Sequence, residues 1–158
     1  MRISDFCEII SGGTPSTKVP SYWNGNIPWI SIKDFVNSNR WVISTEKTIT
    51  QSGVDNSVTH VLQPMDLIIS ARGTVGQVAL IRTPMAFNQS CFGLRCDTSK
   101  CNPLFLFYWL KSHREHVTTG SHGAVFDTIT RADFDRIQVD LPRIEDQRHI
   151  VGTTSSLP

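Results

Sequence analysis

Short β-rich segments, separated by turn-forming residues, dominate the first two thirds of this chain and constrain its fold more than any other feature. Asp66–Ala71 has the continuous apolar pattern of a buried strand. The glycine-containing connector Arg72–Gly76 leads directly to a second strand-like segment, Gln77–Ile81, and this tight spacing predicts a hairpin or a bulge. Cys91–Cys96 has the same character. The sequence therefore predicts a largely buried sheet.

A further β-rich segment, Ile27–Ile32, follows Trp23–Asn26, whose Asn-Gly-Asn sequence predicts a turn. Aromatic residues are dense around it. Such aromatics either pack in a core or stack on single-stranded nucleic acid, and core packing is the commoner role. The cluster consists of Tyr22, Trp23, Trp29, Phe35 and Trp41.

Helical signals are concentrated in the last third of the chain. Asn102–Pro103 combines a good N-cap with proline at the first helical position. Apolar residues then recur at helical spacing as far as Val117, so we expect a helix that ends by Gly120. Thr130–Arg136 predicts a second, short helix, with Asp133 in its first turn, where a carboxylate favours the helix dipole.

The C-terminal segments complete a mixed α/β pattern. Ile137–Leu141 alternates as a strand does, and Pro142 precedes a helical stretch over Arg143–Val151. The tail, Gly152–Pro158, is a poor helix former and is expected to fray. Strands followed by helices predict an α+β fold, that is, a mixed α/β domain.

Composition excludes several classes of protein. Of 158 residues, 39% are hydrophobic and 18% are charged, which is typical of a folded domain rather than a disordered chain. No apolar run approaches the roughly 18 residues of a membrane span, and the N-terminus lacks the pattern of a signal peptide. We therefore expect a cytoplasmic protein. Its formal net charge is +1, so binding to nucleic acid would require a local basic patch.

The four cysteines predict buried, reduced thiols. Cys91, Cys96 and Cys101 are evenly spaced, which suggests a metal site at first sight. Structural zinc sites usually contain cysteine pairs two to four residues apart, and this sequence has none. We therefore expect Cys7 and the other three to be core residues without a metal.

The segment Ser11–Lys18 is rich in glycine, serine and threonine and ends in a lysine. Its backbone N–H groups and hydroxyls, with Thr17 and Lys18, fit a phosphate group. The spacing of a nucleotide-binding P-loop is absent, and by itself this composition is more typical of an ordinary surface turn.

Three other positions have polar chemistry suited to DNA. Arg72 follows a predicted strand on a glycine-flanked turn, from which it can reach a phosphate or a base edge, although a solvated turn arginine is the alternative. Gln89 and Ser90 fit adenine and phosphate, but they fit turn capping as well. His122 lies in a Gly-Ser-His-Gly segment, and a lone histidine is more often incidental than catalytic.

No catalytic constellation is present in the sequence. Asn102–Phe105 resembles the motif with which adenine methyltransferases hold their target amine, but the second proline is missing. No glycine-rich loop for S-adenosylmethionine accompanies it, and an N-cap explains these residues. No nucleophile–histidine–acid set and no metallonuclease spacing is found. We expect a protein that is not an enzyme and has no cofactor of its own.

Taken together, five segments in order resemble the specificity (S) subunits of bacterial type I restriction–modification systems. The C-terminal residues Leu141–Pro142, Glu145–Gln147 and Ile150 resemble the start of that family's conserved spacer helix. The five segments are Cys7–Ser16, Ile27–Asp34, Ile69–Gly76, Asn88–Ser90 and Gly123–Ile129.

The resemblance implies a target-recognition domain that binds double-stranded DNA and recognises one half of a bipartite site. It implies a twisted, partly barrel-like β-sheet with flanking helices, similar to the target-recognition domain of type II adenine methyltransferases. Methylation (M) and restriction (R) subunits would be its partners, and S-adenosylmethionine, ATP and magnesium would belong to them. The candidate DNA-binding residues on the matching segments are Thr17, Lys18, Lys33, Arg72, Gln89, Ser90 and His122.

The chain departs from the family at its C-terminus, where the leucine-rich spacer helix is expected to continue. We therefore expect a recognition domain over residues 1–141 and a truncated start of the spacer helix over residues 142–158. The short helix predicts a monomer or a weak dimer. Two alternatives stay open, namely an interaction or decoy module that does not bind DNA, and a diverged methyltransferase fragment.

Overall fold

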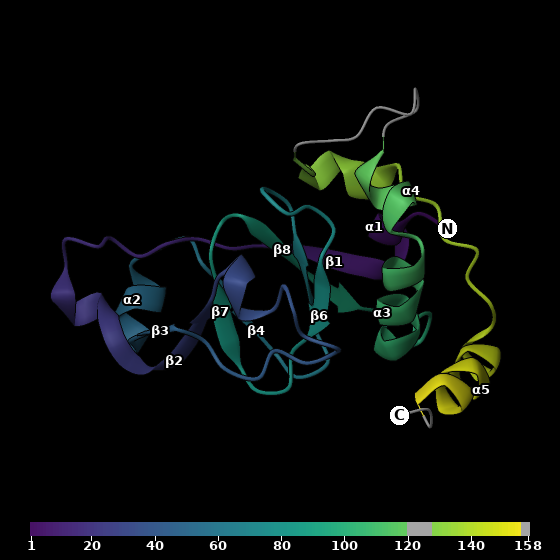
Figure 1. Ribbon diagram of the computed structural model, residues 1–158, viewed down its shortest axis with the longest axis horizontal. Helices are drawn as coiled ribbons and strands as arrows, with labels where there is room; N and C mark the ends of the chain where they lie inside the picture. Colours follow the sequence, from purple (N-terminus) through teal and green to yellow (C-terminus); the bar gives the residue numbers. More distant parts are fainter. Residues whose placement is uncertain (120–127, 156–158) are drawn as a thin grey trace.

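Two four-stranded sheets form most of the molecule, and the longer helices lie toward one end of it. The computed structural model describes residues 1–119 and 128–155. Figure 1 shows β2 (Trp23–Ile30), β3 (Lys47–Ile49) and α2 (Gln51–Asp55) at one end of the long axis, and α5 (Ile144–Ser155) at the other. The mixed α/β prediction is confirmed, in the form of two open sheets rather than a closed barrel.

The first sheet is antiparallel throughout, with the order β1-β8-β5-β6. Three of its strands lie where apolar runs predicted them, and β5 and β6 form the expected hairpin across Arg72–Gly76. The left-handed backbone of Gly73 (φ 72°) and Gly76 (φ 87°) closes this connection. The strands are β1 (Cys7–Ser11), β5 (Leu67–Ser70), β6 (Val78–Leu80) and β8 (Cys91–Cys96).

The second sheet has the order β3-β2-β7-β4, with β2 parallel to β7. The turn expected at Trp23–Asn26 is wrong, because these residues lie inside β2. Trp23 and Ile27 both oppose Ile49, so the residues between them form a bulge, in which Asn24 has a φ of 62°. The strands are β2 (Trp23–Ile30), β3 (Lys47–Ile49), β4 (Val61–Leu62) and β7 (Met85–Phe87).

β5 and β6 of the first sheet are buried on both faces, which explains their continuous apolar runs. Successive side chains of a strand point to opposite faces. Accordingly, Leu67 and Ile69 of β5 pack with Leu106 and the other helical core residues, whereas Ile68 packs with Phe87 between the two sheets. All five side chains are at most 1% exposed. These two strands therefore offer only their ends and one edge to a ligand.

The long helix predicted after Asn102 is broken once. Asn102 is its N-cap, since its Oδ1 accepts a hydrogen bond from the N–H of Leu104 at 2.9 Å. The chain then leaves helical geometry at His113 (φ −116°, ψ 32°) and forms a second helix. The two are α3 (Pro103–Ser112) and α4 (Arg114–Thr118).

Shorter helical elements complete the structure. The helix predicted over Thr130–Arg136 is present as a 3₁₀ helix, η3 (Arg131–Asp135), and Asp133 accepts a hydrogen bond from the N–H of Thr130 at 2.7 Å. No helix of the described residues is long and apolar enough to cross a membrane. The remaining elements are α1 (Ile3–Phe6), η1 (Pro20–Tyr22), η2 (Ile32–Asp34) and α2 (Gln51–Asp55).

Two expectations at the C-terminal end are wrong. Ile137–Leu141 forms no strand, because only Gln138 makes an isolated bridge, to Arg2. The last helix, α5 (Ile144–Ser155), continues past Gly152, where fraying was expected. Extending an existing helix costs less than starting one, and α5 is anchored in its first turns by the buried Gln147. The Gln147 side chain bonds Lys100 O, Pro142 O and the N–H of Asn102 at 2.7–2.8 Å.

Candidate nucleic-acid interface

One end of the first sheet brings together three loops that lie far apart in the sequence. The antiparallel register places Ser11 opposite Phe92, and Ser70 opposite Cys91. The end of β1, the start of β8 and the β5–β6 connection therefore meet at the same end of the sheet. The loops are Gly12–Lys18, Asn88–Ser90 and Ala71–Gln77.

The glycine-rich loop is held down by packing and is not an open phosphate cradle. The N–H of Gly13 donates to Phe87 O at 3.0 Å, and the indole N–H of Trp29 donates to Gly13 O at 2.9 Å. A Cβ on Gly12 would lie 2.2 Å from the carbonyl oxygen of Asn88, so only glycine permits this approach. The glycines therefore serve close packing of the loop.

Gln89 and the glycine-rich loop, predicted separately, are in direct contact. The Thr14 hydroxyl donates to Gln89 Oε1 at 2.5 Å, which orients the amide of an otherwise exposed side chain. The amide NH₂ of Gln89 makes no hydrogen bond to the described residues. Since glutamine can offer both an oxygen and an NH₂ group to adenine, the free NH₂ is the available half of that pair.

Ser90 and Arg72 occupy neighbouring loops at this sheet end. The N–H of Ala71 donates to Ser90 O at 2.8 Å, and Ser90 N–H donates to Asn88 Oδ1 at 3.0 Å. Arg72 is exposed, its backbone bridges to Thr128, and its guanidinium has no hydrogen bond or ion pair within the described residues. The structure thus brings Arg72, Gln89 and Ser90 to one end of the sheet.

Two basic or polar residues that the sequence did not indicate also lie here. Arg131 of η3 donates to Ile9 O at 2.6 Å and to the Ser11 hydroxyl, and its guanidinium stacks on Phe92. The ring Nδ1 of His60 lies 2.7 Å from Ser11 O. Only the fold brings these side chains to the end of β1, so no local sequence signal marks them.

Lys33 is engaged within the protein. It lies in η2, just after β2, whose Ile30 O accepts the N–H of Asn88 at 3.0 Å. Its ammonium group forms an ion pair with Glu46, which raises the pKa of Lys33 and lowers the pKa of Glu46. Binding of a phosphate by Lys33 would compete with this exposed pair.

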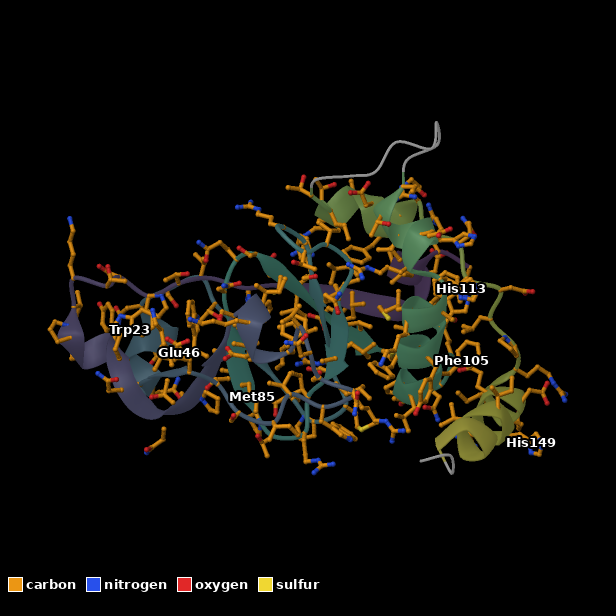
Figure 2. All side chains as sticks on the ribbon, viewed as in Figure 1. Trp23, Glu46, Met85, Phe105, His113 and His149 are labelled. Atoms are coloured by element: carbon orange, nitrogen blue, oxygen red, sulfur yellow. The ribbon has the colours of Figure 1, made fainter. Side chains whose placement is uncertain are left out.

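Thr17 and Lys18 lie away from the sheet end that carries Arg72 and Gln89, on the run of chain that leads to β2. Both are exposed, and the N–H of Lys18 donates to Ser16 Oγ at 3.3 Å. The indole N–H of Trp23 donates to Ser16 O at 3.0 Å and ties this run to β2. Figure 2 shows Trp23 and Glu46 at this end of the long axis, with His149 at the opposite end. His122 lies outside the described residues.

The bulge of β2 forms a second polar patch, which the sequence analysis missed because it interpreted these residues as a turn. Asn24 and Asn26 are both exposed, and their side chains make no hydrogen bond to the described residues. Their strand is rigidly supported. The rings of Trp23 and Trp29 meet edge to face at 5.3 Å, and Lys47 Nζ lies 5.9 Å from the Trp23 ring centre. The rings of Trp23 and Trp29 therefore pack against each other and support β2, in agreement with the core-packing role favoured from the sequence.

The chemistry of the site is that of recognition. Exposed arginine and amide groups on these loops suit hydrogen bonding to bases and phosphates. Within residues 1–119 and 128–155, no group of three or more His, Cys, Asp or Glu side chains is arranged to hold a metal ion.

Comparison with family models matches residues 1–157 to the type I restriction modification DNA specificity domain. The chain belongs to this family. The resemblance inferred from the five sequence segments is confirmed. So is the expectation of a chain that is not an enzyme, because this is a family of specificity domains rather than of catalytic subunits.

Curated relatives carry the same designation. The MjaIX specificity subunit of Methanocaldococcus jannaschii is 28% identical over 156 residues, which cover 98% of this chain. The EcoprrI specificity subunit of Escherichia coli is 26% identical over 146 residues, or 90% of this chain. The chain spans 36% of the length of either relative.

Solved structures share the fold. The HsdS subunit from Thermoanaerobacter tengcongensis has a TM-score of 0.74 at 22% identity, and the match covers 99% of this chain and 36% of that one. The type I S subunit from M. genitalium has a TM-score of 0.62 at 16% identity, covering 99% and 37%. Both matches support the predicted fold class.

Proposed function

We propose that this chain is a sequence-specific module for double-stranded DNA that recognises one half of a bipartite target site. The observation that carries the proposal is the convergence of Arg72, Gln89 and Ser90 at one end of a sheet whose strand β5 is buried on both faces. Membership of the specificity-domain family supplies the class of ligand.

The exposed groups suit distinct parts of a duplex. Arg72 fits the O6 and N7 atoms of guanine, and Gln89 fits adenine, in the major groove. Lys18 and Thr17 suit phosphates, which position a protein without specifying sequence. The bulge residues Asn24 and Asn26 extend the set of amides suited to adenine. This division explains how a chain of net charge +1 binds DNA through local groups.

Catalysis would belong to the partner subunits. M subunits would bind S-adenosylmethionine and methylate the site, and R subunits would use ATP and magnesium for restriction. The recognition domain would need no cofactor of its own. By itself the chain would be a monomer or a weak dimer, which light scattering measures directly. A tight dimer formed through residues 143–158 would contradict this part.

The test is selection from a random pool of duplex DNA, followed by binding titrations at several salt concentrations. The domain should enrich one short sequence, while its affinity for unrelated DNA stays on the order of 10⁻⁴–10⁻⁶ M and falls steeply with salt. Binding without enrichment would indicate a non-specific protein. No binding at low salt would favour the interaction or decoy module instead.

A further inference from the structure

Three thiols meet at the end of the first sheet that lies opposite the candidate interface. Cys7 begins β1 and Cys96 ends β8, and the two are directly opposed in the antiparallel register. Their Sγ atoms are 3.7 Å apart. Cys101, five residues further along the chain, belongs to the same core cluster as Cys7, and all three cysteines are free thiols.

The backbone at this position suits a disulfide. The N–H of Asp97 donates to Phe6 O at 2.8 Å, so the flanking residues carry the hydrogen bond and Cys7–Cys96 is a non-hydrogen-bonded pair. Opposed Cα atoms at such a position are about 4.5 Å apart. Disulfides span Cα distances of about 4.4–6.8 Å. Closing the bond therefore requires side-chain rotation, with little movement of the strands.

Cys96 is the more accessible of the two. It is half-buried, whereas Cys7 is only 8% exposed. A surface hollow of about 330 Å³ is lined by both cysteines together with Glu8, Arg95 and Asp97. A second hollow, of about 390 Å³, is lined by Cys96 and Arg95 from the other side. A small oxidant can therefore reach Cys96 from solvent.

The neighbouring thiols distinguish the two cysteines chemically. Hydrogen bonding from Cys101, and next from Cys7, lowers the pKa of Cys96. The corresponding hydrogen bond to Cys96, together with burial, raises the pKa of Cys7. Cys96 thus has the greater thiolate character, and the thiolate is the form that attacks peroxides.

We propose that Cys7 and Cys96 form a site of reversible oxidative modification, which hydrogen peroxide or a related peroxide converts to a cross-strand disulfide. The Cys96 thiolate attacks one peroxide oxygen, the O–O bond breaks, and protonation of the leaving oxygen gives water and a sulfenic acid. The Cys7 sulfur then attacks the Cys96 sulfur and displaces its hydroxyl group as a second water. Two thiols and one peroxide give one disulfide and two waters, and a dithiol reductant reverses the change.

Intact-mass and peptide analysis of the full chain after titration with hydrogen peroxide tests the site. We expect a loss of about 2 Da, reversed by dithiothreitol, and a linked peptide pair containing Cys7 and Cys96. Because the bond closes a long loop, the oxidised chain should melt roughly 5–15 °C higher than the reduced chain.

Matched variants separate the roles of the thiols. Cys7→Ser should leave a Cys96 sulfenic acid that dimedone traps, and Cys96→Ser should abolish both trapping and cross-linking. Cys91→Ser, at a buried cysteine in another cluster, should oxidise as the unmodified chain does. A bond mapped to Cys96–Cys101, or overoxidation without any cross-link, would overturn the proposal. The mapping uses the unmodified chain, so a variant that fails to fold leaves the test intact.

Discussion

The two ends of the first sheet are built from the same strands but organised differently. At one end, buried Gln147 ties α5 to the loop before α3, and Cys7 is buried beside the half-buried Cys96. At the other end, the tightly packed Gly12 supports the loop of exposed Gln89, and Arg72 is exposed on the neighbouring loop. The comparison indicates that stability and recognition are separated along the strands. Substitutions at the two ends should therefore give different phenotypes.

The largest loss of stability is expected from Gln147→Ala. It removes three hydrogen bonds and leaves the Asn102 N–H and the carbonyls of Lys100 and Pro142 without these partners. We expect a loss of about 2–4 kcal/mol in the free energy of unfolding, with unchanged DNA affinity at temperatures where the variant is folded. Urea denaturation measures the first quantity. Glu145→Gln, on the exposed side of the same helix, is the control and should change neither.

Gly12→Ala should affect both properties, because the new Cβ would meet the Asn88 carbonyl oxygen at 2.2 Å. Either the glycine-rich loop or the Asn88–Ser90 loop must move. We expect a loss of about 1–3 kcal/mol in stability, together with weaker DNA binding. Gly73→Ala is the matched comparison. Its φ of 72° is strained for alanine, but nothing lies within 4 Å of the new Cβ, so its stability loss should be about 1 kcal/mol. Equal effects of the two substitutions would contradict the packing role assigned to Gly12.

Arg72→Ala should weaken DNA binding without lowering the melting temperature, since the guanidinium is exposed and has no partner among the described residues. Loss of a base contact would cost about 1–3 kcal/mol at one position of the site. Loss of a phosphate contact would instead weaken all sequences and reduce the salt slope by about one.

Titration against matched and mismatched duplexes distinguishes these outcomes for Arg72. Arg148→Ala, at an exposed position on α5, should bind as the unmodified chain does. Normal binding by Arg72→Ala would exclude Arg72 from the interface.

The smallest effect is expected from Asn24→Ala and Asn26→Ala on the β2 bulge. Each removes an amide without a hydrogen bond to the described residues, so folding should be unaffected. If the bulge contacts adenine, the preference for one base should relax by about tenfold. Selection from the random pool with each variant measures this change. An unchanged enriched sequence would restrict recognition to the sheet end that carries Arg72.

Local patterns predicted the first sheet well and the second poorly. Asp66–Ala71 is an apolar run buried on both faces, and burial of that kind is visible in the sequence. Cys91–Cys96 was also predicted as a strand, although Phe92, Arg95 and Cys96 are only half-buried. By contrast, β4 and β7 are strands of two and three residues, too short to show a period. The Asn-Gly pair in β2 has the composition of a turn, although its residues form a bulge whose conformation depends on pairing with β3.

In the candidate site too, some residues could be predicted from local sequence and others depend on the fold. Arg72, Gln89 and Ser90 were predicted from loop chemistry, and the fold places them together. Arg131 was not predicted, because its contacts with Ile9 and Ser11 depend on η3 packing against the first sheet. Ile137–Leu141 was expected to form a strand from its alternation, but its backbone instead bonds the N-terminal residues Met1 and Ile3.

Burial of both faces of β5 and β6 has a consequence for how such a domain can diversify. A strand that must fit neighbours on two sides tolerates few substitutions, whereas residues beyond its last buried position are released from that constraint. Exchanges at the exposed positions of the loops beyond the strand ends, such as Thr17, Arg72 and Gln89, can therefore accumulate while close-packed loop residues such as Gly12 stay fixed. New sequence preferences can arise one loop at a time, without the protein having to evolve a new core.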